Sequence, residues 1–542
     1  MFRLLVIVSL ALAIQVSGQA QVPPPVRTSS TLAQPDATSK PDLPEPLGAL
    51  TPYPANFDPL ALDAYIQKGM ADWQVPGLAI AIVKDGRTIY CKGFGTRTVG
   101  KAEPVDTATQ FMIASNTKLF TGLALAHLAR QKRLSLDDRI VRYFPDFKLY
   151  NDTTTRLVTV RDMLTHRIGT KTFQGDFTYL DGNLTRAQIM ERMRMMKPSQ
   201  QFRQDFGYCN SCYLVAGQVV EKVTGRPWEA FITDSILRPL GMRRTTALGN
   251  DAPTRTNIAR PYTNLYTGKL TEQPYDTWDN LAPAASIIST AADMARWLRF
   301  QLDSGRFNGQ QVMPWPVLQA TRDVQIMAGS RKSRVYPSHF RGYGLGVFVG
   351  DYNGRQVYSH GGGAVGMVST TCFVPEERLG IVVLTNNDNQ SFFDLLRFHL
   401  LDQFLRVPNA PDRSAAALPG FREEMKAQQD SIASWRARAD RQAKLRMAVP
   451  FLPEGTYRNA QYGTVTISKD AKANTMTVRF AHHPQLTARL RWMGGTNWLT
   501  EYNIIEYGIF PAKVASTSDG TPTLTLVVND FIEQDPYTFV KE

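Results

Sequence analysis

Ser115 and Lys118 lie three positions apart in the segment FMIASNTKLFTG (111–122), which is otherwise apolar and helix-forming. Residues at positions i and i+3 share one face of a helix, so the lysine amine can reach the serine hydroxyl. At a helix start, free backbone N–H groups favour negative charge. The pair therefore predicts a nucleophilic serine with an amine to take its proton. The alternative is a capping serine beside an exposed lysine.

A tyrosine and an asparagine precede a second predicted helix. Tyr208 and Asn210 come directly before 211–224, whose valines form an apolar stripe. The pattern Y-x-N also occurs at Tyr262 and Tyr457. Tyr457 belongs to the C-terminal part of the chain, and Tyr262 precedes no clear helix. Tyr208 is therefore the preferred proton carrier, against the alternatives of a packed loop aromatic and a plain helix cap at Asn210.

The third candidate element is YSHGGGAVG (358–366). His360 ends a predicted strand and is followed by Gly361, Gly362 and Gly363. Glycines allow a ligand to approach the backbone closely, and an N–H there could bind an oxyanion. The alternative is a flexible turn with an exposed histidine.

Strand patterns surround these residues on both sides. The stretch 77–95 predicts a β-hairpin around Asp85-Gly86, and 343–363 predicts another around Asn353-Gly354. Two further strands follow at 367–375 and 378–386, whereas the middle of the chain has mostly helical patterns. We expect an α+β fold, with an antiparallel sheet built from both ends of the domain and covered by helices.

Composition divides the chain into five parts. Residues 1–20 read as a secretory signal peptide and 21–55 as a disordered, Pro-rich leader. A hydrolase domain is expected over 56–405 and a charged helical linker over 406–450. Short β-rich runs over 451–542 predict a small β-barrel domain. We therefore expect a secreted or periplasmic protein with no membrane span.

Charge and cysteines exclude several other classes. The net charge is +13, but the basic residues are dispersed and no nucleic-acid-binding motif is present. The C-x-x-C pair has no second pair and no nearby histidine, so zinc is not expected. Buried thiols, or a bridge between the first and last cysteine, both stay open. The cysteines are Cys91, Cys209, Cys212 and Cys372.

The order S-x-x-K, Y-x-N, H-x-G resembles the serine β-lactamase and penicillin-binding-protein superfamily, specifically its class-C-like branch of esterases, D-aminopeptidases, DD-peptidases and β-lactamases. Framework segments such as PGLAIAIVKDG and VTVRDMLTHRIG are also similar to the family, which covers roughly residues 57–405. The tail from GTYRN resembles a lipocalin-like barrel. His166, within LTHRIG, matches a framework position and is interpreted as structural.

The resemblance implies a role for each site residue. Ser115 would form the acyl-enzyme and Lys118 would take or share its proton. Tyr208, with a pKa lowered by the lysine, would act as general base and then protonate the leaving group. Asn210 would orient the lysine or the substrate. The N–H groups of Ser115 and Gly363 would form the oxyanion hole.

In this resemblance, His360 would support Tyr208 or contact the substrate, and Gly361 and Gly362 would line the substrate site. No metal or organic cofactor is implied. β-Lactamases usually carry Lys-Thr/Ser-Gly at the third motif, where this chain has His360-Gly361-Gly362. Weak or no β-lactam hydrolysis is therefore expected, and esters or D-amino-acid amides and peptides are the expected substrates.

A different class of function is a catalytically silent sensor or binding protein for cell-wall peptides. The presence of all three of Ser115, Lys118 and Tyr208 favours the enzyme. The sequence indicates a small-molecule or peptide substrate as partner, and it does not indicate an oligomeric state.

Overall fold

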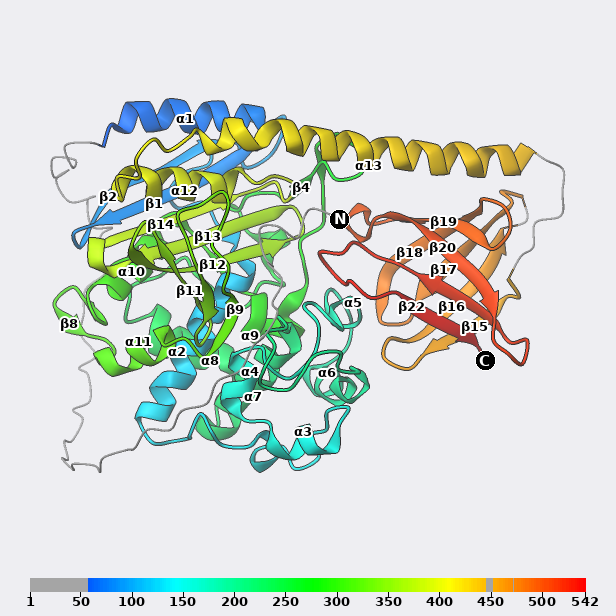
Figure 1. The fold of residues 1–542 in the computed structure, drawn as a ribbon, viewed down its shortest axis with the longest axis horizontal. Coiled ribbons are helices and arrows are strands. Elements are labelled where there is room, and N and C mark those ends of the chain that lie inside the picture. Colours follow the sequence, from blue (N-terminus) through cyan, green and yellow to red (C-terminus); the bar gives the residue numbers. More distant parts are fainter. Residues whose placement is uncertain (1–56, 445–451, 471) are drawn as a thin grey trace.

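The structure, a computed structural model, describes residues 57–444, 452–470 and 472–542 (Figure 1). The predicted signal peptide over 1–20 and the leader over 21–55 lie outside these residues.

An eight-stranded antiparallel sheet forms the centre of the larger domain, as the sequence patterns predicted. In both predicted hairpins the Asx-Gly pair has positive φ at each residue, which is the geometry of a type I′ turn: 51° and 81° at Asp85-Gly86, and 46° and 75° at Asn353-Gly354. The strands, in sheet order, are β2 (Arg87–Gly95), β1 (Gly77–Lys84), β14 (Leu379–Thr385), β13 (Met367–Val374), β12 (Arg355–Ala364), β11 (Phe348–Tyr352), β10 (Arg341–Tyr343) and β9 (Ile326–Gly329).

Both faces of this sheet are buried, and β1 shows why. Leu78, Ile80 and Ile82 pack on one face against helices α1 (Pro59–Asp72) and α12 (Phe392–Phe404). Ala79 and Ala81 point to the other face, where small side chains leave room for α10 (Ala291–Leu302), which belongs to the same core as α2 (Thr117–Arg130). Strand alternation thus sorts large and small residues onto opposite faces. The confirmed result is an antiparallel sheet between helical layers.

The middle of the chain supplies the helical region below the sheet in Figure 1. Its helices are α3 (Asp152–Leu157), α4 (Val160–Leu164), α5 (Asp176–Tyr179), α6 (Arg186–Arg192), α7 (Asn210–Thr224), α8 (Trp228–Ile232), α9 (Ala282–Ala285) and α11 (Trp315–Arg322). Three short pairs, β3 (Phe111–Met112) with β6 (Ile288–Ser289), β4 (Tyr262–Thr263) with β5 (Thr271–Glu272), and β7 (Arg306–Phe307) with β8 (Gln310–Gln311), complete it.

The C-terminal part is a closed eight-stranded barrel, and α13 (Arg413–Lys444) runs from the larger domain to the barrel (Figure 1). At 1.5 Å per residue this helix is about 48 Å long, and it packs against both α12 and the barrel strands β18 to β20. The barrel strands are β15 (Gly455–Asn459), β16 (Gly463–Asp470), β17 (Thr475–Phe480), β18 (His483–Trp492), β19 (Asn497–Tyr502), β20 (Ile509–Ser516), β21 (Pro522–Leu526) and β22 (Tyr537–Lys541).

The barrel core receives a side chain from the larger domain. Phe177 of α5 is 1% exposed and packs among barrel aromatics that include Tyr462 and Tyr537. Beside it, the Gly175 N–H donates a 2.6 Å hydrogen bond to Glu533, in the loop that joins β21 to β22. The two domains are therefore joined at α5, which also lies next to the candidate site.

All four cysteines are free thiols in this structure. The Cys212 thiol donates to the Cys209 sulfur, 2.7 Å away, at the start of α7. Cys372 belongs to the core on the α1 side of the sheet, whereas Cys91 packs against the core on the opposite side, so the two do not bridge. Within the described ranges, every helix is too short or too polar to cross a lipid bilayer.

Candidate functional site

Ser115 lies in a tight 3₁₀ turn, η2 (Ala114–Asn116), immediately before α2 rather than within the predicted helix. Ala114 has a φ of 46°, a left-handed conformation that costs a non-glycine residue about 1 kcal/mol or more. The turn presents the Ser115 side chain at the N-terminus of α2, where backbone N–H groups favour an anion.

Lys118 is completely buried in the first turn of α2, and its Nζ is 3.1 Å from Ser115 Oγ. Two further contacts fix the amine: Asn210 Oδ1 at 2.7 Å and the Ala284 carbonyl oxygen at 2.9 Å. Both of these oxygens only accept hydrogen bonds, so they use two N–H groups of the amine. In the neutral amine the remaining direction holds the lone pair, and it faces the serine hydroxyl.

Burial determines the charge of this amine. Desolvation lowers the Lys118 pKa from 10.5 to about 7, although the nearby carboxyl group of Asp176 acts in the opposite direction. At neutral pH a large share of Lys118 is therefore the uncharged base. A lysine in this state can accept the Ser115 proton, as nucleophile activation requires.

Asn210 is the first residue of α7, and it links Lys118 to a buried carboxyl group. Its Nδ2 donates a 2.6 Å hydrogen bond to Asp176 Oδ2, which fixes its Oδ1 toward the lysine. Asp176 is 1% exposed, and burial raises the pKa of its carboxyl well above the usual 3.8. Because Asp176 belongs to α5, the helix that is inserted into the barrel also orients the lysine partner.

Tyr208 lies beside the pair, but its protonation differs from the prediction. The Lys118 Nζ lies 4.7 Å from the centre of the Tyr208 ring, over its face rather than at the hydroxyl. Burial raises the Tyr208 pKa well above 10, and the nearby Tyr343 raises it further. Hydrogen bonding to Ser115 acts in the opposite direction. The expectation of a lowered pKa at Tyr208 is therefore wrong, because desolvation exceeds any effect of the lysine.

The Tyr208 hydroxyl makes no hydrogen bond of normal geometry with any residue that the structure describes, although Ser115 is close enough to influence its pKa. The neutral phenol thus retains a proton that it can donate. Its ring is held in place by His166, which stacks on it at a centroid distance of 4.3 Å.

His166 is fully buried, and its Nδ1 accepts the Cys209 N–H at 3.0 Å. It therefore orients the Tyr208 loop from behind, in agreement with the structural interpretation of this histidine. Burial lowers the His166 pKa well below 6.5, so the ring is neutral.

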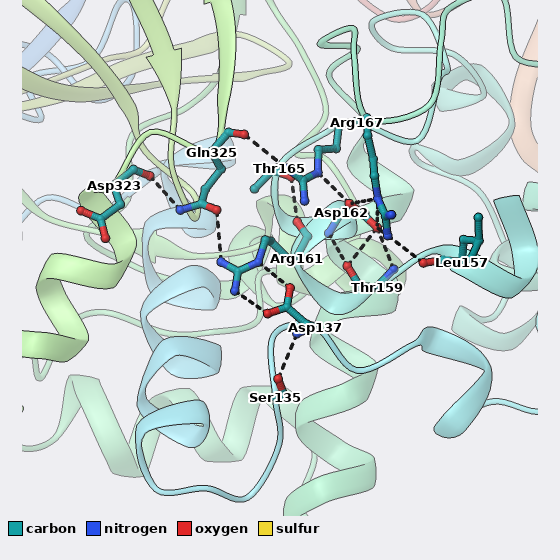
Figure 2. Close-up of polar contacts among 11 residues, drawn as sticks. Ser135, Asp137, Leu157, Thr159, Arg161, Asp162, Thr165, Arg167, Asp323 and Gln325 are labelled. Atoms are coloured by element: carbon teal, nitrogen blue, oxygen red, sulfur yellow. Dashed lines mark hydrogen bonds and ion pairs between the residues drawn. The ribbon is translucent and has the colours of Figure 1, made fainter. Parts of the chain in front are cut away.

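An ion-pair network holds the His166 segment in place (Figure 2). Asp162, fully buried, accepts from the Thr159 N–H, from Arg167 at 2.6 Å and from Arg203 at 2.8 Å. Although burial opposes its charge, the two arginines lower the Asp162 pKa. Arg161 of the same helix pairs with Asp137. The network braces α4 and the loop that carries His166.

His360 lines the cavity from β12, and the tyrosine with which it shares a hydrogen bond is Tyr343 rather than Tyr208. Its Nε2 is 3.1 Å from the Tyr343 hydroxyl, and its Nδ1 donates to the Gly361 carbonyl oxygen at 2.6 Å. Burial, followed by the Lys118 charge, lowers the His360 pKa to about 3, so the imidazole is neutral at pH 7. The Tyr208 and His360 ring centres are 6.1 Å apart.

The three glycines belong to β12, which continues to Ala364, so they are not a flexible turn. A Cβ at Gly362 would lie 2.0 Å from the Ile113 carbonyl oxygen, so β12 can approach the nucleophile turn only with glycine there. A Cβ at Gly363 would lie 2.2 Å from the Phe531 ring of the barrel. At Gly361 a Cβ would have space.

A cavity of about 720 Å³ joins these groups. Of the predicted site residues it is lined by Ser115, Tyr208, Asn210, His360, Gly361, Gly362 and Gly363. Lys118 lies beneath its wall. The other two Y-x-N tyrosines lie elsewhere: the Tyr262 hydroxyl accepts from the Val99 N–H, and the Tyr457 hydroxyl donates to the Pro453 carbonyl oxygen in the barrel.

Sequence reasoning missed Asp176, Tyr343 and the barrel residues Glu506 and Phe531, which all contact the site or line its cavity. Asp176 lies in the 170–205 segment, whose conformation has no local signal. Tyr343 belonged to a predicted strand, and its alternation with Gly342 and Gly344 gave no sign of a polar role. The barrel residues had no signal, because their relevance depends on how the domains pack.

The beta-lactamase family profile matches residues 62–404. Protein flp of Staphylococcus aureus (strain MW2) is 27% identical over 353 residues, which are 64% of this chain and 66% of that protein. Penicillin-binding protein 4 of Amycolatopsis lactamdurans is 29% identical over 344 residues, 61% of this chain and 87% of that protein.

The chain thus spans slightly less than two thirds of the length of the flp proteins. Among solved structures, the octameric penicillin-binding protein homologue from Pyrococcus abyssi is 22% identical, with a TM-score of 0.57. That alignment covers 90% of this chain and 100% of the other. At this identity the likeness shows a shared fold.

Proposed function

The chain belongs to the beta-lactamase family, and from this premise we propose that it is a serine hydrolase that acts through a Ser115 acyl-enzyme on esters or on D-amino-acid amides and peptides. The observation that carries the proposal is the amine of Lys118. It is buried, has a pKa of about 7, is fixed by two acceptors and is 3.1 Å from the Ser115 hydroxyl.

In the proposed mechanism, neutral Lys118 takes the Ser115 proton as Oγ attacks the substrate carbonyl carbon. The N–H groups of Ser115 and Gly363 bind the oxyanion. As the bond to the leaving group breaks, the Tyr208 phenol gives that group its proton. The Lys118 ammonium then restores the Tyr208 proton, because the phenolate is the stronger base. Water hydrolyses the acyl-enzyme by the same steps in reverse order.

Asn210 is a positioning residue in this mechanism, since it orients the lysine. His360 supports the cavity wall through Tyr343, and Gly361 and Gly362 bring the backbone of β12 close to the substrate. These steps need no metal or organic cofactor.

Weak or absent β-lactam hydrolysis is part of the proposal. The antibiotic carboxylate needs a cation at the third motif, and His360, with a pKa of about 3, supplies none at neutral pH. We also propose export to the periplasm or the outside of the cell, on the pattern of residues 1–20.

A fluorophosphonate probe tests the nucleophile. We expect one adduct on the wild type, none on Ser115→Ala, and full labelling of Ser330→Ala, which removes another serine that lines the same cavity. Failure to label the wild type, under conditions that label a known serine hydrolase, would refute the proposed function. Nitrocefin, a p-nitrophenyl ester and D-alanine p-nitroanilide, assayed together, then rank the substrate classes.

A further inference from the structure

The cavity next to Ser115 extends to the barrel, and this end is acidic. Asp181 of the larger domain and Glu506 of the barrel both line it. Asp276 lies behind them, and its Oδ2 accepts the Val365 N–H at 2.8 Å. Val365 is two residues from Gly363, so the acidic group adjoins the strand proposed to bind the oxyanion.

These carboxyl groups have no cation of their own. Among the described residues, no lysine or arginine lies within ion-pair distance of Asp181, Asp276 or Glu506. Glu506 is 3% exposed, yet its Oε2 has no hydrogen-bond donor within the described part of the chain, whereas the carboxyl groups of Asp276 and Asp181 are hydrogen-bonded to each other. A buried carboxyl oxygen without a partner is costly, which indicates that a positively charged ligand belongs here.

The surroundings indicate which kind of cation fits. No group of three or more histidine, cysteine or acidic side chains within the described ranges is arranged to hold a metal ion. Trp278, which lies close to Asp276 in the chain, and Tyr507, which follows Glu506, line the same cavity, and Phe531 covers Gly363. Aromatic faces next to carboxylates are the surroundings that bind organic ammonium groups, through cation–π attraction together with ion pairing.

We propose that the barrel end of the cavity binds an organic ammonium group on the substrate, held by Asp181 and Glu506 against the rings of Trp278 and Tyr507. As a statement about substrate class, this inference rests on the proposed function. The barrel thus supplies one wall of the substrate site, and it selects cationic substrates for Ser115.

The electrostatics of the three carboxyl groups would couple ammonium binding to their protonation. Burial raises the pKa of each of the three carboxyl groups. Repulsion from Asp181 and Glu506 adds to the rise at Asp276, and repulsion from Asp388 and Asp181 adds to the rise at Glu506. The raised pKa values favour the protonated, neutral carboxyl groups in the absence of a ligand. A bound ammonium group would favour their ionised form instead, so we expect its binding to release protons.

Two matched substrate pairs test the proposal, because the ammonium group could belong to either side of the scissile bond. On the acyl side the pair is D-alanine p-nitroanilide and its N-acetyl derivative. On the leaving-group side it is acetylthiocholine and its neutral analogue 3,3-dimethylbutyl thioacetate. In at least one pair we expect kcat/KM to be tenfold or more higher for the cationic member.

Glu506→Gln, an uncharged variant of the same size, should bring that ratio close to one. Asp530→Asn, at an exposed position of the barrel loop that carries Phe531, should leave the ratio unchanged. Because Glu506→Gln removes repulsion, we expect its melting temperature to equal or exceed that of the wild type. A ratio near one in both pairs for the wild type would overturn the proposal.

A binding measurement separates this result from the proposed function. Calorimetric titration of Ser115→Ala with cyclohexylammonium should show binding, with cyclohexanol as neutral control and loss of binding in Ser115→Ala/Glu506→Gln. Binding without fluorophosphonate labelling of the wild type would refute the hydrolase and retain the ammonium site. Labelling of the wild type without a cation preference and without ammonium binding would retain the hydrolase and refute the ammonium site.

Discussion

Replacing Lys118 with methionine tests the central electrostatic claim, that this amine is forced toward its neutral form by burial. The structure lowers the Lys118 pKa from 10.5 to about 7. One pKa unit corresponds to about 1.4 kcal/mol, so protonated Lys118 opposes folding by roughly 5 kcal/mol at low pH. Methionine has a similar length and no charge, and therefore does not carry this cost.

The sign of the pH effect follows from proton binding. The unfolded chain protonates Lys118 up to pH 10.5, whereas the folded chain releases this proton near pH 7. The unfolded state therefore binds more protons throughout this window, and the contribution of Lys118 to stability rises with pH. Between pH 6 and pH 9.5 the wild type should gain about 3 kcal/mol relative to Lys118→Met.

Chemical denaturation of the full-length proteins at both pH values measures this difference. The hydrogen bonds that Lys118→Met loses, to Asn210 and to the Ala284 carbonyl, affect both pH values almost equally, so they cancel. Activity supplies a second readout: kcat/KM for a p-nitrophenyl ester should fall tenfold per pH unit below about 7, and Lys118→Met should be inactive. Parallel stability–pH curves for the two proteins would refute the lowered pKa and the role of Lys118 as the base.

Three further predictions concern the remaining parts of the site. Tyr208→Phe should lower kcat for the p-nitroanilide by a factor of about 10² to 10⁴, whereas Tyr262→Phe, remote from the cavity, should change it less than twofold; equal effects would mean that Tyr208 is not the proton donor. Gly362→Ala should slow fluorophosphonate labelling at least tenfold, because its Cβ would lie 2.0 Å from a carbonyl oxygen of the nucleophile turn, and unchanged labelling would contradict the close approach. Phe177→Ala should cost about 3 to 5 kcal/mol in a denaturation experiment and lower kcat as well, because Asp176 is on the same helix; a stability loss with normal kcat would show that the barrel does not position the lysine.

The order of the three motifs and most of the sheet could be predicted because their signals are local. Ser115 and Lys118 are separated by one helical turn, and Asp85-Gly86 determines its own turn type. Tyr208 could be chosen among three candidates because a clear helix follows it. The spacing of residues in the sequence does not show how deeply each side chain is buried, however. Burial lowers the pKa of Lys118 and raises that of Tyr208, and it thereby decides which of the two is the base.

The contribution of the barrel to the cavity could not be predicted from local sequence patterns either, for the same reason. Glu506 and Phe531 are more than 140 residues from His360 in the sequence, and no periodicity connects them to it. Both reach the cavity because α5 docks Phe177 into the barrel core, an event of tertiary packing. A sequence pattern could predict the barrel itself, but not that one of its edges closes the site.

The third motif and the barrel together account for the charge preference that we propose. A lysine at position 360 would add a second cation beside Arg341, whose charge already lowers the His360 pKa, and would favour anionic substrates, whereas the neutral His360 adds no charge of its own. In the low dielectric of a buried cavity, the addition of one unit charge acts strongly on a ligand. His360→Lys should therefore lower the ratio of kcat/KM between the cationic substrate and its neutral analogue. Residue 360 itself is not among the groups proposed to hold the ammonium. An unchanged ratio in folded His360→Lys would mean that the acidic end and the third motif act independently of each other.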